Sequence, residues 1–419
     1  MNVSYVLTVI FLIQIQFLNM AIPGRFSHVV ITLFVFILIF IFKKKLNFSE
    51  KKLLIISVLV LLYGFIVSAV GFLSYSVSKT NLFYLSDSVV ALIYLTIFIV
   101  TPAIIYFQFS SLNVERFCYL ILFLHSVTLI SAILQVLNLF PNETILNAND
   151  VYVYGRISIL DKEPSVASYR LFFLLWLVFF IKQSFYSSGF KFYSLYSFVY
   201  MILLVFSIVS VKSKLVVLLI PIILVVATFH YFFSKRKISF KKLLLFVFIF
   251  SFFLYFVTES DYFNYAVQYT FVHSDGSFST RALVAIESVR MLLFNPFGVG
   301  MSYPLYLQEY IENSSLLSYF YNSEIKSYVD TSTYSTLISP KSFLLTSLLI
   351  LGFPFVFLVI LIVRNIVKLS INTNCFFINL AFMWFSIFYM VVSDFNIQPL
   401  LYFSIYMVII KSYERKNYC

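Results

Sequence analysis

The chain is organised around residues 279–300, which read STRALVAIESVRMLLFNPFGVG. This segment lies within a longer stretch, Glu259 to Pro340, in which polar, acidic and small residues dominate. Nearly everything outside that stretch consists of long apolar runs. We therefore expect apolar membrane helices that support one large loop. This loop and a shorter one at Asn142–Ser168 are expected to form the functional surface.

The quoted segment itself predicts a helix followed by a turn. Ser279 or Thr280 is expected to cap the N-terminus, because a hydroxyl there accepts a hydrogen bond from an orphan N–H. Six apolar residues then share one helical face, and these are Ala282, Ala285, Ile286, Val289, Leu292 and Leu293. Such an amphipathic helix is expected to lie in the plane of a membrane surface or to cap a cavity. Asn295-Pro296 is expected to end it, and Gly298 and Gly300 to reverse the chain.

The composition places the rest of the chain in a bilayer. Of the 419 residues, 62% are hydrophobic and only 11% are charged, whereas soluble domains carry about 25% charged residues. Runs of about 20 apolar residues suffice to cross the hydrocarbon core as helices. Because these runs are apolar all round, they do not fit the alternating strands of a membrane barrel.

The expected fold is an all-α polytopic membrane protein with about twelve transmembrane helices. The spans are placed near 3–22, 27–42, 53–73, 87–109, 117–139, 169–186, 193–211, 215–233, 243–258, 343–363, 376–393 and 399–410. Residues 1–258 then hold nine spans and a short outer loop at about 140–168. Residues 259–340 form a large extracytoplasmic loop between spans nine and ten, and residues 341–419 hold three spans and a cytoplasmic C-terminus.

The charges indicate how the spans are oriented. The net charge of +12 is concentrated in short clusters between apolar runs, which favours membrane orientation over nucleic-acid binding. With Lys43-Lys44-Lys45 in the cytoplasm, most lysines and arginines fall on the cytoplasmic side. Only three acidic residues join them there, Glu50, Glu115 and Glu414. Both termini are then cytoplasmic, and the first apolar run is read as a retained helix.

Cations on the outer side depart from this rule and become the candidate site. They are Arg25, Lys79, Arg156, Lys162, Arg170, Lys212, Lys214, Arg281, Arg290, Lys326 and Lys341. Lys212 and Lys214 lie between two apolar runs with almost no loop, where charge is expensive and often faces a polar cavity. Arginine meets phosphate oxygens in pairs and lysine supplies a point charge. A lipid pyrophosphate, with its tail between the spans, fits such a rim.

No metal or cofactor is expected. The four histidines and three cysteines are dispersed without ligand spacing, and no nucleotide-binding glycine motif occurs.

The layout resembles the O-antigen polymerases of the wider O-antigen ligase and polymerase superfamily. The residues that carry the resemblance are Arg156 with Glu163-Pro164-Ser165 in the short outer loop, and Arg281 with Asn295–Gly300 in the long one. Ser213-Lys214 is similar to the superfamily's Ser-Arg pair, with lysine in place of arginine. Ligases of the superfamily carry a functional histidine late in the long loop, where this chain reads Ser339-Pro340-Lys341-Ser342. That difference favours a polymerase.

The resemblance implies a membrane glycosyltransferase of the bacterial inner membrane. A growing glycan would move from polyprenyl pyrophosphate to a new lipid-linked repeat unit on the periplasmic face, for lipopolysaccharide biosynthesis. Arg156, Lys214 and Arg281 would hold the pyrophosphates, supported by Lys212 and, more weakly, Arg290 and Lys341. Glu163 would orient or deprotonate the acceptor hydroxyl.

The expected partners are the polyprenyl-pyrophosphate-linked oligosaccharide, membrane lipids and a chain-length-determinant protein. The alternatives are an O-antigen ligase, a flippase for the lipid-linked oligosaccharide, and a non-enzymatic membrane scaffold.

Overall fold

The computed structural model describes residues 48–78, 113–137, 164–185, 192–211, 276–321, 342–371, 375–393 and 397–418, with a few single residues between them. Within these ranges all regular structure is helical and no strand occurs. The helices are α4 (Phe48–Ser78), α6 (Val114–Val136), α7 (Pro164–Phe185), α8 (Phe192–Val211), α12 (Gly276–Phe294), η6 (Gly300–Ser302), α13 (Tyr303–Glu312), α14 (Leu317–Phe320), α16 (Phe343–Leu351), α17 (Phe353–Ile371), α18 (Phe376–Val392) and α19 (Ile397–Tyr418).

The expected helices at 53–73, 117–139, 169–186, 193–211, 376–393 and 399–410 are present as α4, α6, α7, α8, α18 and α19. The spans expected at 3–22, 27–42, 87–109, 215–233 and 243–258 lie mostly or wholly outside the described residues. Four described helices, α4, α6, α7 and α17, are long and apolar enough to cross a membrane. The all-helical, membrane-type fold is thus confirmed for the described part of the chain.

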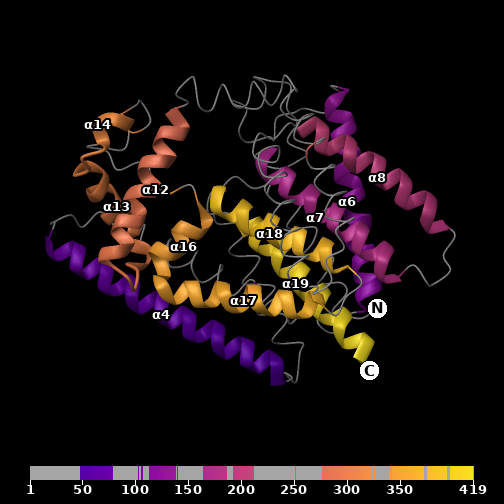
Figure 1. Ribbon diagram of the computed structural model, residues 1–419, viewed down its shortest axis with the longest axis horizontal. Coiled ribbons are helices and arrows are strands. Elements are labelled where there is room, and N and C mark those ends of the chain that lie inside the picture. The colour runs from indigo at the N-terminus through magenta and orange to yellow at the C-terminus, as the bar shows by residue number, and fades with distance from the viewer. Residues whose placement is uncertain are drawn as a thin grey trace.

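The helices α6, α7, α8, α18 and α19 pack into one bundle (Figure 1). Aromatic side chains fill its interior, and hydrogen bonds between buried polar side chains join α7 to α18. The Tyr169 hydroxyl donates to Ser386 Oγ at 2.9 Å, and the Trp176 indole N–H donates to Asn379 Oδ1 at 2.9 Å. Because hydrocarbon offers no hydrogen-bond partners, such pairs fix which helix faces meet.

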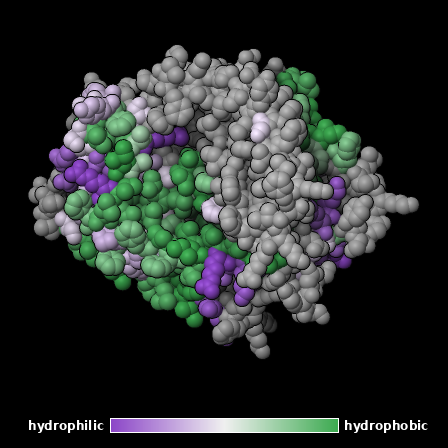
Figure 2. Space-filling model, viewed as in Figure 1, coloured by the Kyte–Doolittle hydropathy of each residue, from purple (hydrophilic) through white to green (hydrophobic). Residues whose placement is uncertain are grey.

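The helices α4 and α17 lie at the edge of this arrangement. Only 17% of the apolar window of α4 and 11% of that of α17 is buried, against 72% for α7. Figure 2 shows the resulting apolar surface gathered over the α4 side of the molecule. These two helices therefore present the surface that a bilayer would cover.

The span expected at 343–363 is two helices, which corrects the sequence-based prediction. α16 ends at Leu351 and α17 begins at Phe353, and the two meet at a sharp bend in Figure 1. Gly352 lies between them with φ of 64°, a left-handed conformation that glycine adopts without strain. Pro354 follows, where its missing N–H does no harm in the first helical turn.

We call residues 276–321 the cap; it comprises α12, η6, α13 and α14. The cap lies at the upper left of Figure 1, against α4 and α16. Its apolar core joins Leu283, Val284 and Met291 of α12 to Leu307 of α13 and to Leu349–Leu351 of α16. Residues 276–321 of the loop that sequence analysis singled out therefore form a packed helical unit attached to apolar helices.

Candidate functional site

Helix α12 forms the centre of the cap, and it departs from the sequence-based prediction at two points. The helix begins at Gly276, and Thr280 is buried within it, so the N-cap predicted at Ser279 or Thr280 is wrong. The packed stripe runs through Leu283, Val284, Ser288 and Met291. This buried stripe continues back to Thr280. The helix therefore begins about one turn earlier than a cap at Ser279 or Thr280 would place it.

The apolar face predicted for α12 is mostly exposed. Ile286, Val289 and Leu293 all lie on the outside of the helix, and of the six predicted residues only Leu292 is buried. α12 thus has apolar side chains on two faces, one packed within the cap and one open. An open apolar face on a cap helix suits contact with a membrane surface.

Two of the predicted site residues, Arg281 and Arg290, lie on α12, and both are exposed. They are nine residues apart in the sequence, which corresponds to roughly 13 Å along a helix and half a turn around it. They therefore flank the open apolar face on opposite sides and do not share one face. The other predicted site residues, Arg156, Glu163, Lys212, Lys214 and Lys341, lie outside the described residues.

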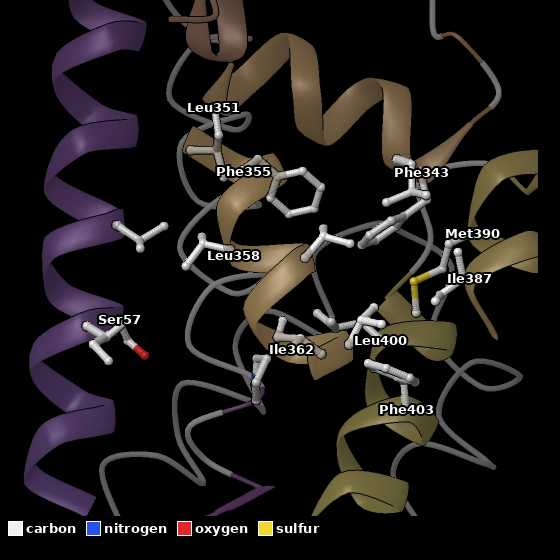
Figure 3. A pocket seen from close by; sticks show the side chains of 16 residues that line it. Ser57, Phe343, Leu351, Phe355, Leu358, Ile362, Ile387, Met390, Leu400 and Phe403 are labelled. Atoms are coloured by element: carbon white, nitrogen blue, oxygen red, sulfur yellow. The ribbon is translucent and has the colours of Figure 1, made fainter. Parts of the chain in front are cut away.

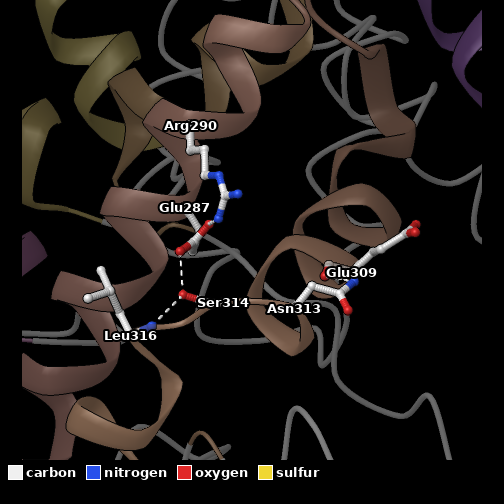
Figure 4. Close-up of polar contacts among 6 residues, drawn as sticks. All are labelled: Glu287, Arg290, Glu309, Asn313, Ser314 and Leu316. Atoms are coloured by element: carbon white, nitrogen blue, oxygen red, sulfur yellow. Dashed lines mark hydrogen bonds and ion pairs between the residues drawn. The ribbon is translucent and has the colours of Figure 1, made fainter.

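A buried carboxylate, Glu287, is the polar centre of the cap (Figure 4). Its side chain is only 2% exposed. Ser314 Oγ donates to Glu287 Oε1 at 2.5 Å, and the Leu316 N–H donates in turn to Ser314 Oγ at 3.2 Å. Since an unpaired buried charge is costly, this chain of hydrogen bonds ties the turn after α13 to α12.

The second oxygen of Glu287 faces Arg290. Glu287 Oε2 lies 3.7 Å from Arg290 Nη1 and accepts no hydrogen bond. The Arg290 guanidinium also lies over the Tyr310 ring, with its central carbon 6.0 Å from the ring centroid. Burial raises the pKa of the Tyr310 phenol above its ordinary value, and the nearby guanidinium opposes that rise. Arg290 is thus held from two sides while 52% of its side chain remains exposed.

Sequence reasoning did not select Glu287, although a signal was available. Glu287 follows Leu283 by four residues and precedes Met291 by four. That spacing places all three on one stripe of a helix. A carboxylate between two apolar residues of one stripe is only a partial signal, because the sequence does not show which apolar face of α12 is packed.

The segment Asn295–Gly300 attaches the cap to the membrane helices. Gly298 and Gly300 have φ of 79° and 64°, so the predicted chain reversal is confirmed. A Cβ atom on Gly298 would lie 2.7 Å from the Gly352 nitrogen, and one on Gly300 would lie 2.3 Å from Ser68 Cα. These contacts require glycine, because side chains essentially never come so close to a backbone.

Hydrogen bonds reinforce the same attachment. The Tyr63 hydroxyl donates to the Phe297 carbonyl at 2.7 Å, and the Met301 N–H donates to Ser68 Oγ at 3.0 Å. On the other side, the Phe353 N–H donates to the Pro296 carbonyl at 2.8 Å. The end of α12 is therefore bonded both to α4 and to the break between α16 and α17.

An apolar pocket lies beside this attachment (Figure 3). It has a volume of about 200 Å³ and is lined by residues of α4, α16, α17, α18 and α19, with Pro102. Among the described residues that line it, Ser57 alone has a polar side chain. The pocket is therefore suited to hydrocarbon and unsuited to a charged ligand.

One further cation from the sequence-based group is buried. Arg170, grouped above with the outward cations, is 1% exposed inside α7. It interacts electrostatically with His125 of α6, which is also buried. Ionisable groups enclosed in a helical bundle are expensive and commonly functional. Arg170 is thus a second residue whose importance the sequence pattern understated.

Over the described residues, this arrangement together with the four apolar helices defines an all-helical membrane protein with a packed cap. Among the residues described, no three His, Cys, Asp or Glu side chains come close enough to hold a metal ion. Comparison of the chain with protein-family models, with curated proteins and with solved structures gives no match.

Proposed function

We propose that this protein is an O-antigen polymerase, a membrane glycosyltransferase that extends a lipid-linked glycan on the periplasmic face of the bacterial inner membrane. The proposal rests on the residues that resemble this family in the sequence. The observation that carries it furthest is the cap, because two exposed arginines on one helix are anchored against apolar helices. In this proposal the two cations would lie beside the head group of a membrane lipid.

The reaction needs charge stabilisation more than it needs a cofactor. A hydroxyl oxygen of the acceptor repeat unit bonds to the anomeric carbon of the donor glycan. The bond from that carbon to the pyrophosphate oxygen breaks, and polyprenyl pyrophosphate leaves with the electron pair while a base removes the hydroxyl proton. Preplaced cations stabilise the charge that develops on the leaving group.

Arg281 and Arg290 would each bind a phosphate group from its own side of α12. Their separation of about half a helical turn suits two distinct anionic groups better than one. The two lipid pyrophosphates of donor and acceptor supply such a pair. Arg156, Lys212, Lys214 and Lys341 remain proposed contributors to the same binding, and Glu163 remains the proposed group for the acceptor hydroxyl.

The test is the glycan profile of a deletion strain that carries single variants. Arg281→Ala and Arg290→Ala should leave the protein inserted and yield mostly single-repeat glycan on the lipid A core. Arg364→Ala removes an exposed arginine from α17 and should preserve long ladders. Normal ladders from the double variant Arg281→Ala/Arg290→Ala would refute the role proposed for the cap.

The same gel separates a polymerase from the two alternatives, and the leaflet that holds the lipid-linked units separates the alternatives from each other. Loss of a polymerase leaves single repeats attached to the core. Loss of a ligase leaves no repeat attached, and loss of a flippase strands lipid-linked units in the cytoplasmic leaflet.

A further inference from the structure

The pocket in Figure 3 is partly open and is lined by the helices α4, α16, α17, α18 and α19. Val60 comes from α4, Val359 from α17, and Met390 from α18. Phe343, Phe355 and Phe403 add aromatic surface from α16, α17 and α19. Side chains distant in the sequence thus line one apolar pocket.

Water is a poor occupant of this pocket. A buried water needs two to four polar partners, and an apolar cavity of ~150 Å³ stays dry and takes up benzene. The present pocket is larger, at about 200 Å³, and of its described lining residues only Ser57 carries a hydroxyl. Unfilled space of this size forfeits dispersion contacts on every wall, so hydrocarbon is the favoured occupant.

Hydrocarbon is also the solvent next to the pocket. Two of its walls, α4 and α17, are the least buried of the candidate spans. Exposed apolar side chains stand directly beside lining residues, as Leu59 does beside Val60 and Ile360 beside Val359. A lipid hydrocarbon chain that is already in the bilayer would therefore reach the pocket without crossing water.

The pocket and the cap share a wall. Phe343, Leu344 and Leu351 of α16 line the pocket, while Leu349 and Ile350 of the same helix pack in the core of the cap. An amphiphile with its anionic head at the cap and its tail in the pocket would contact α16 on both sides. This geometry fits a lipid substrate better than a soluble one.

We infer that the pocket between α4, α16, α17, α18 and α19 binds a segment of the isoprenoid chain of the polyprenyl carrier. The choice of an isoprenoid chain rests on the proposed function, because that reaction takes polyprenyl-linked substrates. The pocket thereby sets where the carrier's tail lies while its head group is held at the cap.

Photolabelling tests this inference. The full-length protein in phospholipid nanodiscs would receive a polyprenyl phosphate with a diazirine in its chain, and the labelled peptides would be mapped by mass spectrometry. Labels should concentrate on α16, α17 and α18 at the lining residues. Labels spread evenly over the exposed faces of α4 and α17 would overturn the inference.

Val359→Trp fills the pocket, and Ile360→Trp is its matched control. Ile360 is the next residue of α17 and is 56% exposed, so its variant adds the same indole on the lipid side. Val359→Trp should lower labelling of the lining residues about tenfold. An indole that excludes about two methylene groups of the lipid from an apolar site weakens binding by about that factor. Equal labelling in the two variants would contradict the inference. If Val359→Trp does not fold, Val363→Phe adds less volume to the same wall.

A competition experiment identifies which kind of lipid chain the pocket binds. Unlabelled polyprenyl phosphate should displace the probe, whereas an equal excess of phosphatidylglycerol should not. Displacement by the phospholipid would assign the pocket to acyl chains and overturn the isoprenoid assignment. This readout needs no glycan synthesis. It can therefore fail while the ladder test of the proposed function succeeds, and the reverse holds as well.

Discussion

Gly300 lies directly against Ser68, so that a Cβ atom on Gly300 would be 2.3 Å from the Ser68 α-carbon. The next residue strengthens the contact, since the Met301 N–H donates to Ser68 Oγ at 3.0 Å. The Ser68 hydroxyl itself donates to the Gly64 carbonyl at 2.6 Å. Ser68 of α4 thus packs against the turn that follows the central helix of the cap and accepts a hydrogen bond from it.

Gly300→Ala should therefore loosen the cap. Its φ of 64° costs a residue with a side chain ~1–2 kcal/mol, and the contact with the Ser68 backbone adds to that. We expect a lower melting temperature in detergent and faster proteolysis within residues 276–321. Ser74→Ala, at an exposed position of α4, should leave the melting temperature at the wild-type value. An unchanged melting temperature of the Gly300→Ala variant would show that the contact between Gly300 and Ser68 is not tight.

The hydrogen bond from Ser314 to Glu287 gives a second prediction. Ser314→Ala leaves a buried carboxylate without its donor, which should destabilise the cap by ~1–3 kcal/mol. In a Glu287→Gln background the same substitution should cost less, because no buried charge is left behind. The measurement is a double-mutant cycle on thermal unfolding.

The control for that cycle is Asn313→Ala. The Asn313 amide donates to the Glu309 carbonyl at 2.9 Å on an exposed surface, as Figure 4 shows beside the Glu287 cluster. Its loss should cost little, since water replaces the bond. Strictly additive effects of Ser314→Ala and Glu287→Gln would argue against coupling between the two side chains.

The bundle offers a spectroscopic prediction. The chain has two tryptophans, and one of them, Trp176, donates its indole N–H to Asn379. Asn379→Leu should shift the tryptophan emission to the blue and lower stability by about 0.6 kcal/mol, the average for such bonds in membrane bundles. Asn365→Leu, at an exposed position of α17, should do neither. An unshifted spectrum in Asn379→Leu would place Trp176 away from that amide.

Orientation in the membrane can be checked by cysteine labelling. In a background without Cys118, Cys375 and Cys419, Tyr319→Cys presents a thiol on the cap at a position that is 83% exposed. A membrane-impermeant maleimide added outside should label it. Lys368→Cys, in the last turn of α17, should react only after lysis. The reverse pattern would invert the proposed topology.

The described helices were largely predictable, because an apolar run long enough to cross a membrane satisfies its backbone only as a helix. The break inside the span at 343–363 was not. Gly352-Phe353-Pro354 is tolerated within many membrane helices, and here the carbonyl of Pro296, from the distant cap, accepts the Phe353 N–H. A partner remote in the sequence therefore decided the local structure.

The candidate site was predictable only in outline. The sequence placed Arg281 and Arg290 on one helix, and α12 carries both. It did not reveal that Glu287 lies on the buried stripe, because α12 is apolar on both sides and a helical wheel alone gives no preference between them. The packing of α13 and α16 made that choice, through Leu283, Met291 and Leu307.

The double role of α16 has a mechanical consequence. A movement of this short helix that changed the pocket beside Phe343 would also change how Leu349 and Ile350 pack in the core of the cap. Tail occupancy and head-group affinity would then be linked, each altering the other by the same factor. A carrier that has lost its glycan could in this way be released at both ends together.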